Sequence, residues 1–249
     1  MTPIADYYNL LQLKNKIAYQ DNYIIHYLAE MEDIICKLPS KSINLIFTDP
    51  PYLLKGNKIM GWDGGRDYVT DIDQNGFADD FNYENLDILN NLCINPNMAF
   101  FCNKAQIPSY IKKVEQFKLN WNILSWHKPN CIPIGNLYLL DTEFIFHMWK
   151  DLKVKKSPVN TFWMHNIVTG EAADIHPTAK PERIVADIIR QLTDEGDIVL
   201  DCFSGTGTTA VCCKRLKRKC ISIEHNKVYS DFSIERYKHT EAGVEQRGF

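Results

Sequence analysis

The hydrophobic pattern of the chain alternates between short apolar runs and longer segments in which apolar residues recur at helical spacing. The runs are β-branched or aromatic and too short for helices, so they predict about seven buried strands. The weakest of them is Ile17–Gln20. The six clear runs are residues 43–48, 98–102, 121–126, 143–148, 198–201 and 220–224.

The clearest helical pattern covers residues 182–193, with one apolar face formed by Ile184, Val185, Ile188, Ile189 and Leu192. Pro181 precedes it, where a missing N–H is harmless at a helix start. Weaker helical patterns cover residues 208–216, 227–237 and 27–37. Strands that are apolar on both faces and alternate with helices predict an α/β fold, with a doubly wound, mostly parallel sheet of seven strands.

Two segments follow neither periodicity. Residues 53–80 hold five glycines among many polar residues, and residues 150–175 open with four lysines. Loops of this length in a compact domain are usually functional or mobile. We therefore expect a single domain over residues 1–249, with loop insertions at about 53–80 and 150–175.

The charge of the chain is nearly balanced, because 28 Lys and Arg face 31 Asp and Glu, for a formal charge of −3. This excludes a basic surface spread over the whole protein, so any contact with nucleic acid has to be local. The eight cysteines contain no C-x-x-C pair and mostly lie in apolar runs, which indicates reduced core thiols rather than a metal site. No signal peptide and no apolar run near the ~18 residues of a membrane span is evident, so we expect a cytoplasmic protein with no membrane partner.

A glycine-rich turn, DCFSGTGTTA, follows the predicted strand at residues 198–201. Gly205 and Gly207 allow the backbone to approach a ligand closely. The run also satisfies the dinucleotide-binding fingerprint, with Glu224 at the end of the next strand, where a ribose-binding acid belongs. Nicotinamide cofactors and S-adenosylmethionine both bind such turns, and a tight turn without any ligand gives the same pattern. The segment alone leaves these alternatives open.

A second motif, Asp49-Pro50-Pro51-Tyr52, comes directly after the apolar run at residues 43–48. It therefore lies at a carboxyl end of the sheet, where open α/β sheets place their ligands. The two prolines hold the carbonyls of Asp49 and Pro50 in a preset direction. Asp49 supplies a carboxylate and Tyr52 a flat ring, which together suit a planar group bearing an NH2. A helix-capping Asp before a proline turn is the structural alternative, but it would not need the longer motif.

Both motifs resemble those of a known family. INLIFTDPPY resembles the catalytic motif of amino-group DNA methyltransferases, and DCFSGTGTTA looks like their S-adenosylmethionine motif. HPTAKP at residues 176–181 is similar to the cofactor-binding segment that precedes the glycine motif in the β-class order. WHKPN at residues 126–130 and DTE at residues 141–143 also resemble stretches of that family. The resemblance covers roughly residues 17–237 and implies a Rossmann-like, S-adenosylmethionine-dependent methyltransferase.

The resemblance implies a role for each matched residue of the glycine turn. Phe203, Gly205 and Gly207 would form the wall and floor under S-adenosylmethionine. Asp201 would lie near its methionyl amine, and Glu224 would accept hydrogen bonds from its ribose hydroxyls. The implied cofactor site also includes Ser204 and Thr208.

Three further cofactor contacts are implied outside that turn. Thr178 and Lys180 would meet the methionyl end. Asp21 occupies the place of a family acid near the cofactor adenine, although the family usually has Gly where this chain has Gln20.

The implied reaction is transfer of a methyl group to N6 of adenine in double-stranded DNA. Hydrogen bonds from the amine to Asp49 and to the Pro50 carbonyl would favour a pyramidal nitrogen aimed at the methyl group. A base in a duplex has to be flipped, at a cost of a few kcal/mol. Stacking on Tyr52 would return roughly 1–3 kcal/mol.

The DNA contacts are expected from local basic groups, and a solvated charged face is the structural alternative for each of them. The candidates are Lys112, Lys113 and Lys118, the lysines of residues 150–156, and Lys55, Lys58 and Arg66. The most basic run, residues 214–219, ends a predicted helix where cations favour the dipole, so we interpret it as structural.

Target recognition has little room in this chain. About 25 residues separate Trp149 from His176, too few for a separate target-recognition domain. Recognition then falls to residues 53–80 and 128–140 or to a second subunit, which predicts a short recognition sequence and a homodimer. A cognate restriction enzyme is a further partner that the resemblance implies.

Several alternatives stay open. The same fold could act on cytosine N4, RNA or a protein amide, but Asp49 favours adenine, because cytosine-N4 relatives tend to have Ser there and amide-modifying relatives Asn. A nicotinamide-dependent oxidoreductase would use the Gly205 turn and leave residues 49–52 and 176–181 unexplained. A DNA-binding relative without catalytic activity is a third alternative.

Overall fold

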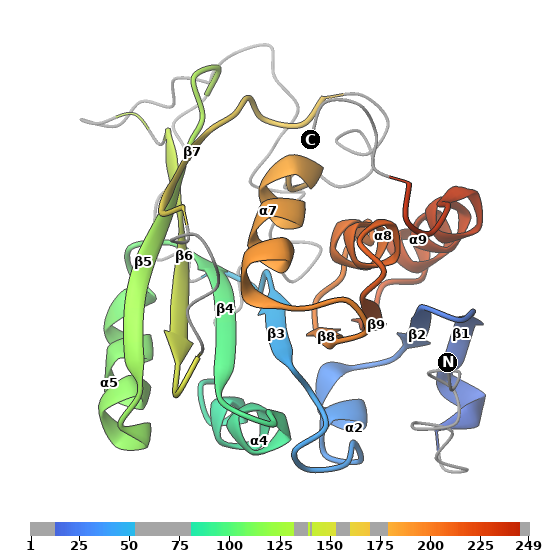
Figure 1. Ribbon diagram of the computed structural model, residues 1–249, viewed down its shortest axis with the longest axis horizontal. Coiled ribbons are helices and arrows are strands. Elements are labelled where there is room, and N and C mark those ends of the chain that lie inside the picture. The colour runs from blue at the N-terminus through green and yellow to red at the C-terminus, as the bar shows by residue number, and fades with distance from the viewer. Residues whose placement is uncertain are drawn as a thin grey trace.

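The computed structural model describes residues 13–52, 81–131, 139, 141–152, 160–169 and 179–244, which form one mixed sheet with its helices (Figure 1). The predictions made for residues 53–80, for residues 153–159 and for Thr178 and His176 lie outside the described residues.

The sheet contains nine strands of the described chain. They are β1 Ile17–Gln20, β2 Ile24–Leu28, β3 Leu45–Thr48, β4 Asn97–Cys102, β5 Asn120–His127, β6 Thr142–Trp149, β7 Phe162–Met164, β8 Ile198–Asp201 and β9 Lys219–Glu224. Their order is β1-β2-β9-β8-β3-β4-β6-β5-β7. Five of the eight neighbouring pairs are parallel, including the four between β2 and β4. Strands β1 and β6 run antiparallel to their neighbours.

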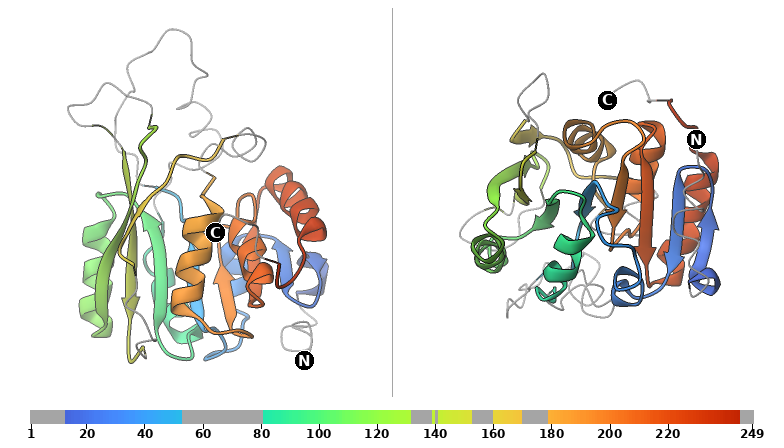
Figure 2. Two further views of the ribbon diagram at one scale, coloured as in Figure 1. Left: turned by 45° about the horizontal axis from the view of Figure 1, so that its top comes forward. Right: turned by 60° about the horizontal axis from the view of Figure 1, so that its bottom comes forward.

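Helices cover both faces of this sheet, as the turned views of Figure 2 show. They are α2 Met31–Ile35, α4 Asn85–Leu92, α5 Ile107–Phe117, α7 Glu182–Leu192, α8 Thr208–Arg215 and α9 Lys227–His239, with a short 3-10 turn at Lys14–Lys16. One hydrophobic cluster combines Ile46 of β3 with residues of α2, α4 and α5, and the other combines Phe47 with residues of α7 and α8. Adjacent residues of a strand point to opposite faces, so the sheet is doubly wound.

The connections of the sheet reverse direction between β8 and β3. From β3 the chain passes through α4 to β4 on one side, whereas from β8 it passes through α8 to β9 on the other. Because β8 and β3 are parallel neighbours, their carboxyl ends meet at this reversal. Open α/β sheets bind their ligands at such a point.

The observed elements agree with the predicted fold class and differ from the prediction in two strands. Strands β2 and β7 were not expected, so the predicted count of seven was too low for the described chain. The helix predicted over residues 27–37 begins only at Met31, because Tyr27 and Leu28 belong to β2, which pairs with both β1 and β9. The helices predicted at residues 182–193, 208–216 and 227–237 are α7, α8 and α9.

Six of the eight cysteines are buried, as expected for core thiols, whereas Cys36 is exposed and Cys131 is partly exposed. Within the described ranges, none of the helices combines the length and the apolar character that crossing a bilayer would require.

Candidate active site

A cavity opens at the carboxyl ends of β3 and β8, and eleven of the predicted site residues line it. They are Asp49, Pro50, Pro51, Tyr52, Lys180, Asp201, Phe203, Ser204, Gly205, Thr208 and Glu224. The two sequence motifs therefore face one space although about 150 residues separate them in the chain. Residues of other segments complete the wall, among them Glu30, Phe101 and His225.

The glycine turn after β8 is held by the side chain of Glu224. Its Oε2 accepts a hydrogen bond from the backbone N–H of Gly205 at 2.8 Å, and its Oε1 accepts one from the N–H of Asn226 at 2.8 Å. Gly205 has a φ of +49°, a left-handed value that favours glycine. Burial raises the pKa of Glu224. A carboxylate offers about four acceptor sites, so Glu224 retains capacity for ribose hydroxyls on the cavity side.

Two polar atoms on the cavity wall lack partners among the described residues. They are Oγ of Ser204 and Oδ1 of Asp49, both buried and both without a hydrogen bond. Buried polar groups nearly always have a partner, so two such atoms in one cavity indicate a polar ligand. A ligand with a charged amino-acid end, a ribose and a flat base fits this wall, because carboxylates, a hydroxyl, glycine backbone and the Phe203 ring all face the cavity.

The ends of β3 and β8 are joined by the side chain of Thr48. Its hydroxyl donates to Oδ1 of Asp201 at 2.7 Å and accepts hydrogen bonds from the backbone N–H groups of Cys202 and Phe203, each at 3.1 Å. Burial raises the pKa of Asp201 to about 6, and hydrogen bonds from Thr48 and its neighbours oppose that rise. Thr48 was not among the predicted site residues, although it directly precedes Asp49.

Asp49 lies in a row of four alternating charges. Its Oδ2 is 2.5 Å from Nζ of Lys180, which in turn lies 3.5 Å from Oε2 of Glu143. Oε1 of Glu143 accepts a hydrogen bond from Nζ of Lys128 at 3.0 Å. The Tyr52 hydroxyl donates to Oε2 of Glu143 at 3.3 Å, which fixes the ring beside the cavity.

These charges shift one another's titration. Burial raises the pKa of Asp49, and the Lys180 ammonium offsets this only in part. Burial acts in the same direction on Glu143, but Lys180 and Lys128 outweigh it and lower the Glu143 pKa. Burial alone would lower the pKa of Lys180, whereas the carboxylates of Asp49 and Glu143 raise it. The pKa values of the two carboxyls are therefore shifted in opposite directions, upward for Asp49 and downward for Glu143.

The backbone of the Asp-Pro-Pro-Tyr motif is held by Gln106, a residue outside both sequence motifs. Gln106, at the start of α5, is fully buried, and its Nε2 donates to the carbonyl of Pro51 at 2.9 Å. Its Oε1 accepts a hydrogen bond from the N–H of Asn103 at 3.1 Å. A buried glutamine with both ends of its amide bonded is a rigid support for the segment that carries Tyr52.

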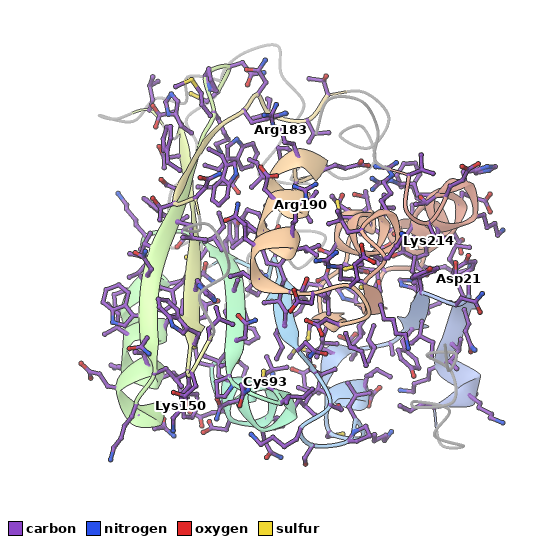
Figure 3. The ribbon with its side chains drawn as sticks, viewed as in Figure 1. Asp21, Cys93, Lys150, Arg183, Arg190 and Lys214 are labelled. Carbon is purple, nitrogen blue, oxygen red and sulfur yellow. The ribbon has the colours of Figure 1, made fainter. Side chains whose placement is uncertain are left out.

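Two predicted cofactor residues do not line the cavity. The carboxylate of Asp21 accepts hydrogen bonds from the backbone N–H groups of Tyr23 and Ile24 at 2.8 Å and lies 2.5 Å from Nζ of Lys214. It stabilises the β1–β2 turn at the edge of the sheet, where Figure 3 labels Asp21 and Lys214 together. Gly207 has a φ of +77°, directly precedes α8 and lies against Tyr237, and it is not among the residues that line the cavity.

Several lysines and arginines considered for DNA contact are paired within the protein. Lys214 contacts Asp21, Arg215 contacts Glu182, and the buried Arg218 donates to Thr193, which agrees with the structural interpretation of that run. The buried Lys113 lies 2.5 Å from Asp87 and is not available for phosphate.

The fold and this cavity define a class. A doubly wound sheet that brings a glycine turn and an Asp-Pro-Pro-Tyr segment to one cavity is the Rossmann-like arrangement of an S-adenosylmethionine-dependent methyltransferase. The family model described as DNA methylase, of the N6/N4 type, matches residues 43–235. The chain therefore belongs to this family of DNA methyltransferases, and S-adenosylmethionine is its cofactor.

Individual relatives agree with this assignment. The chain is 30% identical over 255 residues to the type II methyltransferase M2.DpnII of Streptococcus pneumoniae, a match that covers 90% of this chain and 93% of the relative. It is 27% identical to M.HinfI of Haemophilus influenzae over 81% of this chain and 64% of that one. Among solved structures, the M1.HpyAVI complex with S-adenosylmethionine superposes with a TM-score of 0.64 at 26% identity, covering 86% of this chain and 98% of the other. The PvuII cytosine-N4 methyltransferase superposes with a TM-score of 0.68 at 17% identity, over 94% of this chain and 90% of the PvuII chain. At this identity the match supports the fold alone.

Proposed function

We propose that the protein transfers a methyl group from S-adenosylmethionine to the exocyclic N6 of an adenine flipped out of double-stranded DNA. The observation that carries this proposal is the buried Oδ1 of Asp49, which accepts no hydrogen bond among the described residues and lies on the cavity wall beside the Tyr52 ring. An unused carboxylate oxygen beside an aromatic face suits a planar base that carries an NH2.

The residues around Asp49 act on the nitrogen that receives the methyl group. An exocyclic amine is a poor nucleophile, because its lone pair is delocalised into the ring. A hydrogen bond from the amine to Oδ1 of Asp49, with a second to the Pro50 carbonyl, draws that lone pair out of conjugation. The nitrogen would then accept the methyl group as the S–C bond of the sulfonium breaks, and the proton that the nitrogen loses would pass to solvent. Such catalysis depends on orientation and on preorganised charge, so it needs no covalent nucleophile.

The residues of the glycine turn hold the donor, which when bound supplies an electrophilic methyl group on a sulfonium. On the cavity wall, Glu224 would accept hydrogen bonds from the ribose hydroxyls, Asp201 would bind the methionyl amine, and Ser204 offers its unpartnered hydroxyl. Phe203 and Thr208 complete the wall on this side. The hydrogen bond between Thr48 and Asp201 joins the ends of β3 and β8, so it would hold the donor site and Asp49 in a fixed relation.

The experiment that tests this function identifies the modified base. Duplex DNA is incubated with the protein and labelled S-adenosylmethionine, digested to nucleosides and separated. We expect label in N6-methyladenine. Label in N4-methylcytosine alone would replace adenine by cytosine as the target, and label in RNA but not in DNA would replace the nucleic acid.

A matched pair of carboxylate variants tests the assignment of Asp49. Asp49→Asn should lower the rate of methylation by about 10²–10³-fold, because it removes preorganised negative charge at the reacting amine, and should leave cofactor binding intact. Asp231→Asn, on the exposed side of α9, should retain the wild-type rate. An Asp49→Asn variant with full activity would contradict the assignment.

We further propose that residues 1–249 act as one methyltransferase domain, and that recognition of a short sequence is shared between residues 53–80, residues 128–140 and a second copy of the chain. The short interval between Trp149 and Lys180 supports this proposal. Sedimentation with a DNA duplex should give a homodimer, and a strict monomer on DNA would contradict it. A cognate restriction enzyme is proposed on the type II relatives alone.

A further inference from the structure

Lys180 is a buried lysine whose ammonium lies between two carboxylates. Its side chain is 7% exposed, and Nζ lies 2.5 Å from Oδ2 of Asp49 and 3.5 Å from Oε2 of Glu143. Nζ also lies over two aromatic rings, 5.5 Å from the centroid of Tyr52 and 5.0 Å from that of Phe101. Cations are attracted to ring faces at such distances. The position of this ammonium is thus determined from four sides.

The oxygens of the two carboxylates are divided between different donors. Lys180 takes Oδ2 of Asp49, and Oδ1 of Asp49 accepts no hydrogen bond among the described residues. Oε1 of Glu143 is held by Lys128, and Oε2 by Tyr52 and Lys180. Glu143 is therefore fixed by three neighbours, whereas one oxygen of Asp49 stays available on the cavity wall.

We propose that Lys180 is a positioning residue, which holds Asp49 ionised and oriented so that Oδ1 faces the acceptor amine. This inference rests on the proposed methyl transfer to an exocyclic amine. It differs from the expectation that Lys180 meets the methionyl end of the cofactor, because the ammonium is directed at the two carboxylates. Without a nearby cation, a carboxylate in this buried place would be protonated over a wider range of pH and would no longer accept a hydrogen bond from the amine.

Groups on every element around Asp49 affect its charge. They include Tyr52 on its own segment, Glu143 on β6, Cys102 on β4 and Asp201 on β8, with Lys180 before α7. Lys180 is the cation in contact with Asp49, and the anionic neighbours act against ionisation. The proposal therefore predicts opposite effects for the removal of Lys180 and for the neutralisation of Glu143.

The experiment measures single-turnover methylation of duplex DNA against pH, together with binding of S-adenosylmethionine by calorimetry. In Lys180→Met, the acidic limb of the rate profile should move upward by about 1–3 pH units, since an adjacent opposite charge lowers a carboxyl pKa by that amount. Lys180→Arg, which keeps the charge, should stay close to wild type. In Glu143→Gln, the limb should move to lower pH, because a like charge is removed while Lys180 remains. Binding of S-adenosylmethionine should change less than about threefold in each variant, which corresponds to about 0.7 kcal/mol.

Lys113→Met is the matched control. Lys113 is as buried as Lys180 and lies 2.5 Å from Asp87, but on the α4–α5 side of the protein. It should lower thermal stability without moving the acidic limb. If Lys180→Met leaves the limb in place and weakens S-adenosylmethionine binding, Lys180 belongs to the cofactor site and the proposal is overturned. An unchanged limb with unchanged binding overturns it too.

If Lys180→Met does not fold, the proposal is tested by Glu143→Gln. An acidic limb of the Glu143→Gln rate profile that moves to higher pH, or does not move, contradicts the proposal. Total label on DNA is counted regardless of the base. A mistaken choice of adenine over cytosine would therefore leave this result unaffected, whereas failure of the wild-type protein to label DNA would refute the proposed function itself.

Discussion

The hydroxyl of Thr48 donates to Oδ1 of Asp201 at 2.7 Å and so joins the end of β3, which carries Asp49, to the end of β8, which carries the glycine turn. The hydroxyl oxygen of Thr48 also accepts hydrogen bonds from the backbone N–H groups of Cys202 and Phe203. One buried side chain thus links the segment proposed to hold the base to the turn proposed to hold the cofactor.

Replacement of Thr48 by Val should therefore destabilise the protein and loosen its active site. The change keeps the shape but removes the Thr48 donor from Asp201 and the acceptor of the Cys202 N–H, at a cost of about 1–3 kcal/mol, whereas the Phe203 N–H keeps its bond to Asp201. Urea unfolding measures this loss. The control is Thr240→Val, since the Thr240 hydroxyl bonds only a carbonyl four residues earlier in α9. Equal stability of Thr48→Val and wild type would show that the link is energetically unimportant.

Asp201 should make the stability of the apo protein depend on pH. Burial raises its pKa to about 6, above the ordinary value of 3.8, so the folded state binds its proton more tightly than the unfolded state. Stability then falls as the pH rises from about 4 to about 6, and the full cost is present above that window. Asp201→Asn should be more stable than wild type at pH 8 by up to about 3 kcal/mol, with no difference near pH 3.5.

Thermal unfolding across this pH range measures the effect of Asp201→Asn, and Asp231→Asn on the surface of α9 is its control. The gain in stability should coincide with weaker binding of S-adenosylmethionine, because a carboxylate that faces a cationic amine is lost. If the difference in stability between Asp201→Asn and wild type does not vary with pH, titration of Asp201 is excluded as the cause of that difference.

Gly207→Ala should be among the more damaging changes in the glycine turn. The alanine would have to adopt the φ of +77° that Gly207 has. Its Cβ would lie 2.5 Å from the Tyr237 hydroxyl oxygen and 2.6 Å from a carbon of the Tyr237 ring. Gly196→Ala is the matched control, because its φ is +88° but nothing lies within 4 Å of an added Cβ. We expect about 1–2 kcal/mol for the left-handed backbone in both variants and a further 1–3 kcal/mol for the contact at Gly207 alone. Equal denaturation midpoints would show that Tyr237 can move aside.

Gln106→Leu should reduce the rate of methylation more than it reduces cofactor binding. Loss of the amide leaves the Pro51 carbonyl without its donor, so the Tyr52 ring can shift, and a displacement of about 1 Å can cost 10²-fold in rate. The control is Gln116→Leu, because Gln116 is exposed on α5 and its amide donates to Asp87 of α4, away from the cavity. Single-turnover rates and calorimetry with S-adenosylmethionine separate the two effects. Parallel losses in rate and in cofactor affinity would point to a general disturbance of the cavity.

The clearest strands predicted from sequence, such as β3 and β4, have apolar runs that are buried on both faces, whereas the weakest, β1, is half exposed. Strand β2 was misinterpreted because His26 interrupts its apolar character. In the structure, the ring nitrogens of His26 lie 2.9 Å from Ser222 on β9 and 2.9 Å from Ser230 on α9. These partners lie about 200 residues away, so the sequence around His26 contains no sign that its polarity is satisfied.

Site residues were likewise predictable where neighbours in the sequence identify them. The residues at the ends of β3 and β8 belong to two contiguous motifs, so the local sequence was enough to predict them. Glu143 and Lys128 lay inside stretches that had been noted, but their role depends on the register of β5 and β6, which sets Trp126 opposite Glu143. Asp21 was placed at the cofactor by its position in the motif order alone, whereas its two backbone hydrogen bonds define a turn.

The row of charges at the cavity also bears on how the protein should respond to salt. Lys128 and Lys180 balance Glu143 and Asp49, and each ion lies within 4 Å of an opposite charge, inside the ~8 Å screening length of physiological salt. Added salt should therefore change the chemical step little once DNA is bound. The ionic-strength dependence of methylation would instead report the phosphate contacts made elsewhere on the surface, and the slope of affinity against salt would count them.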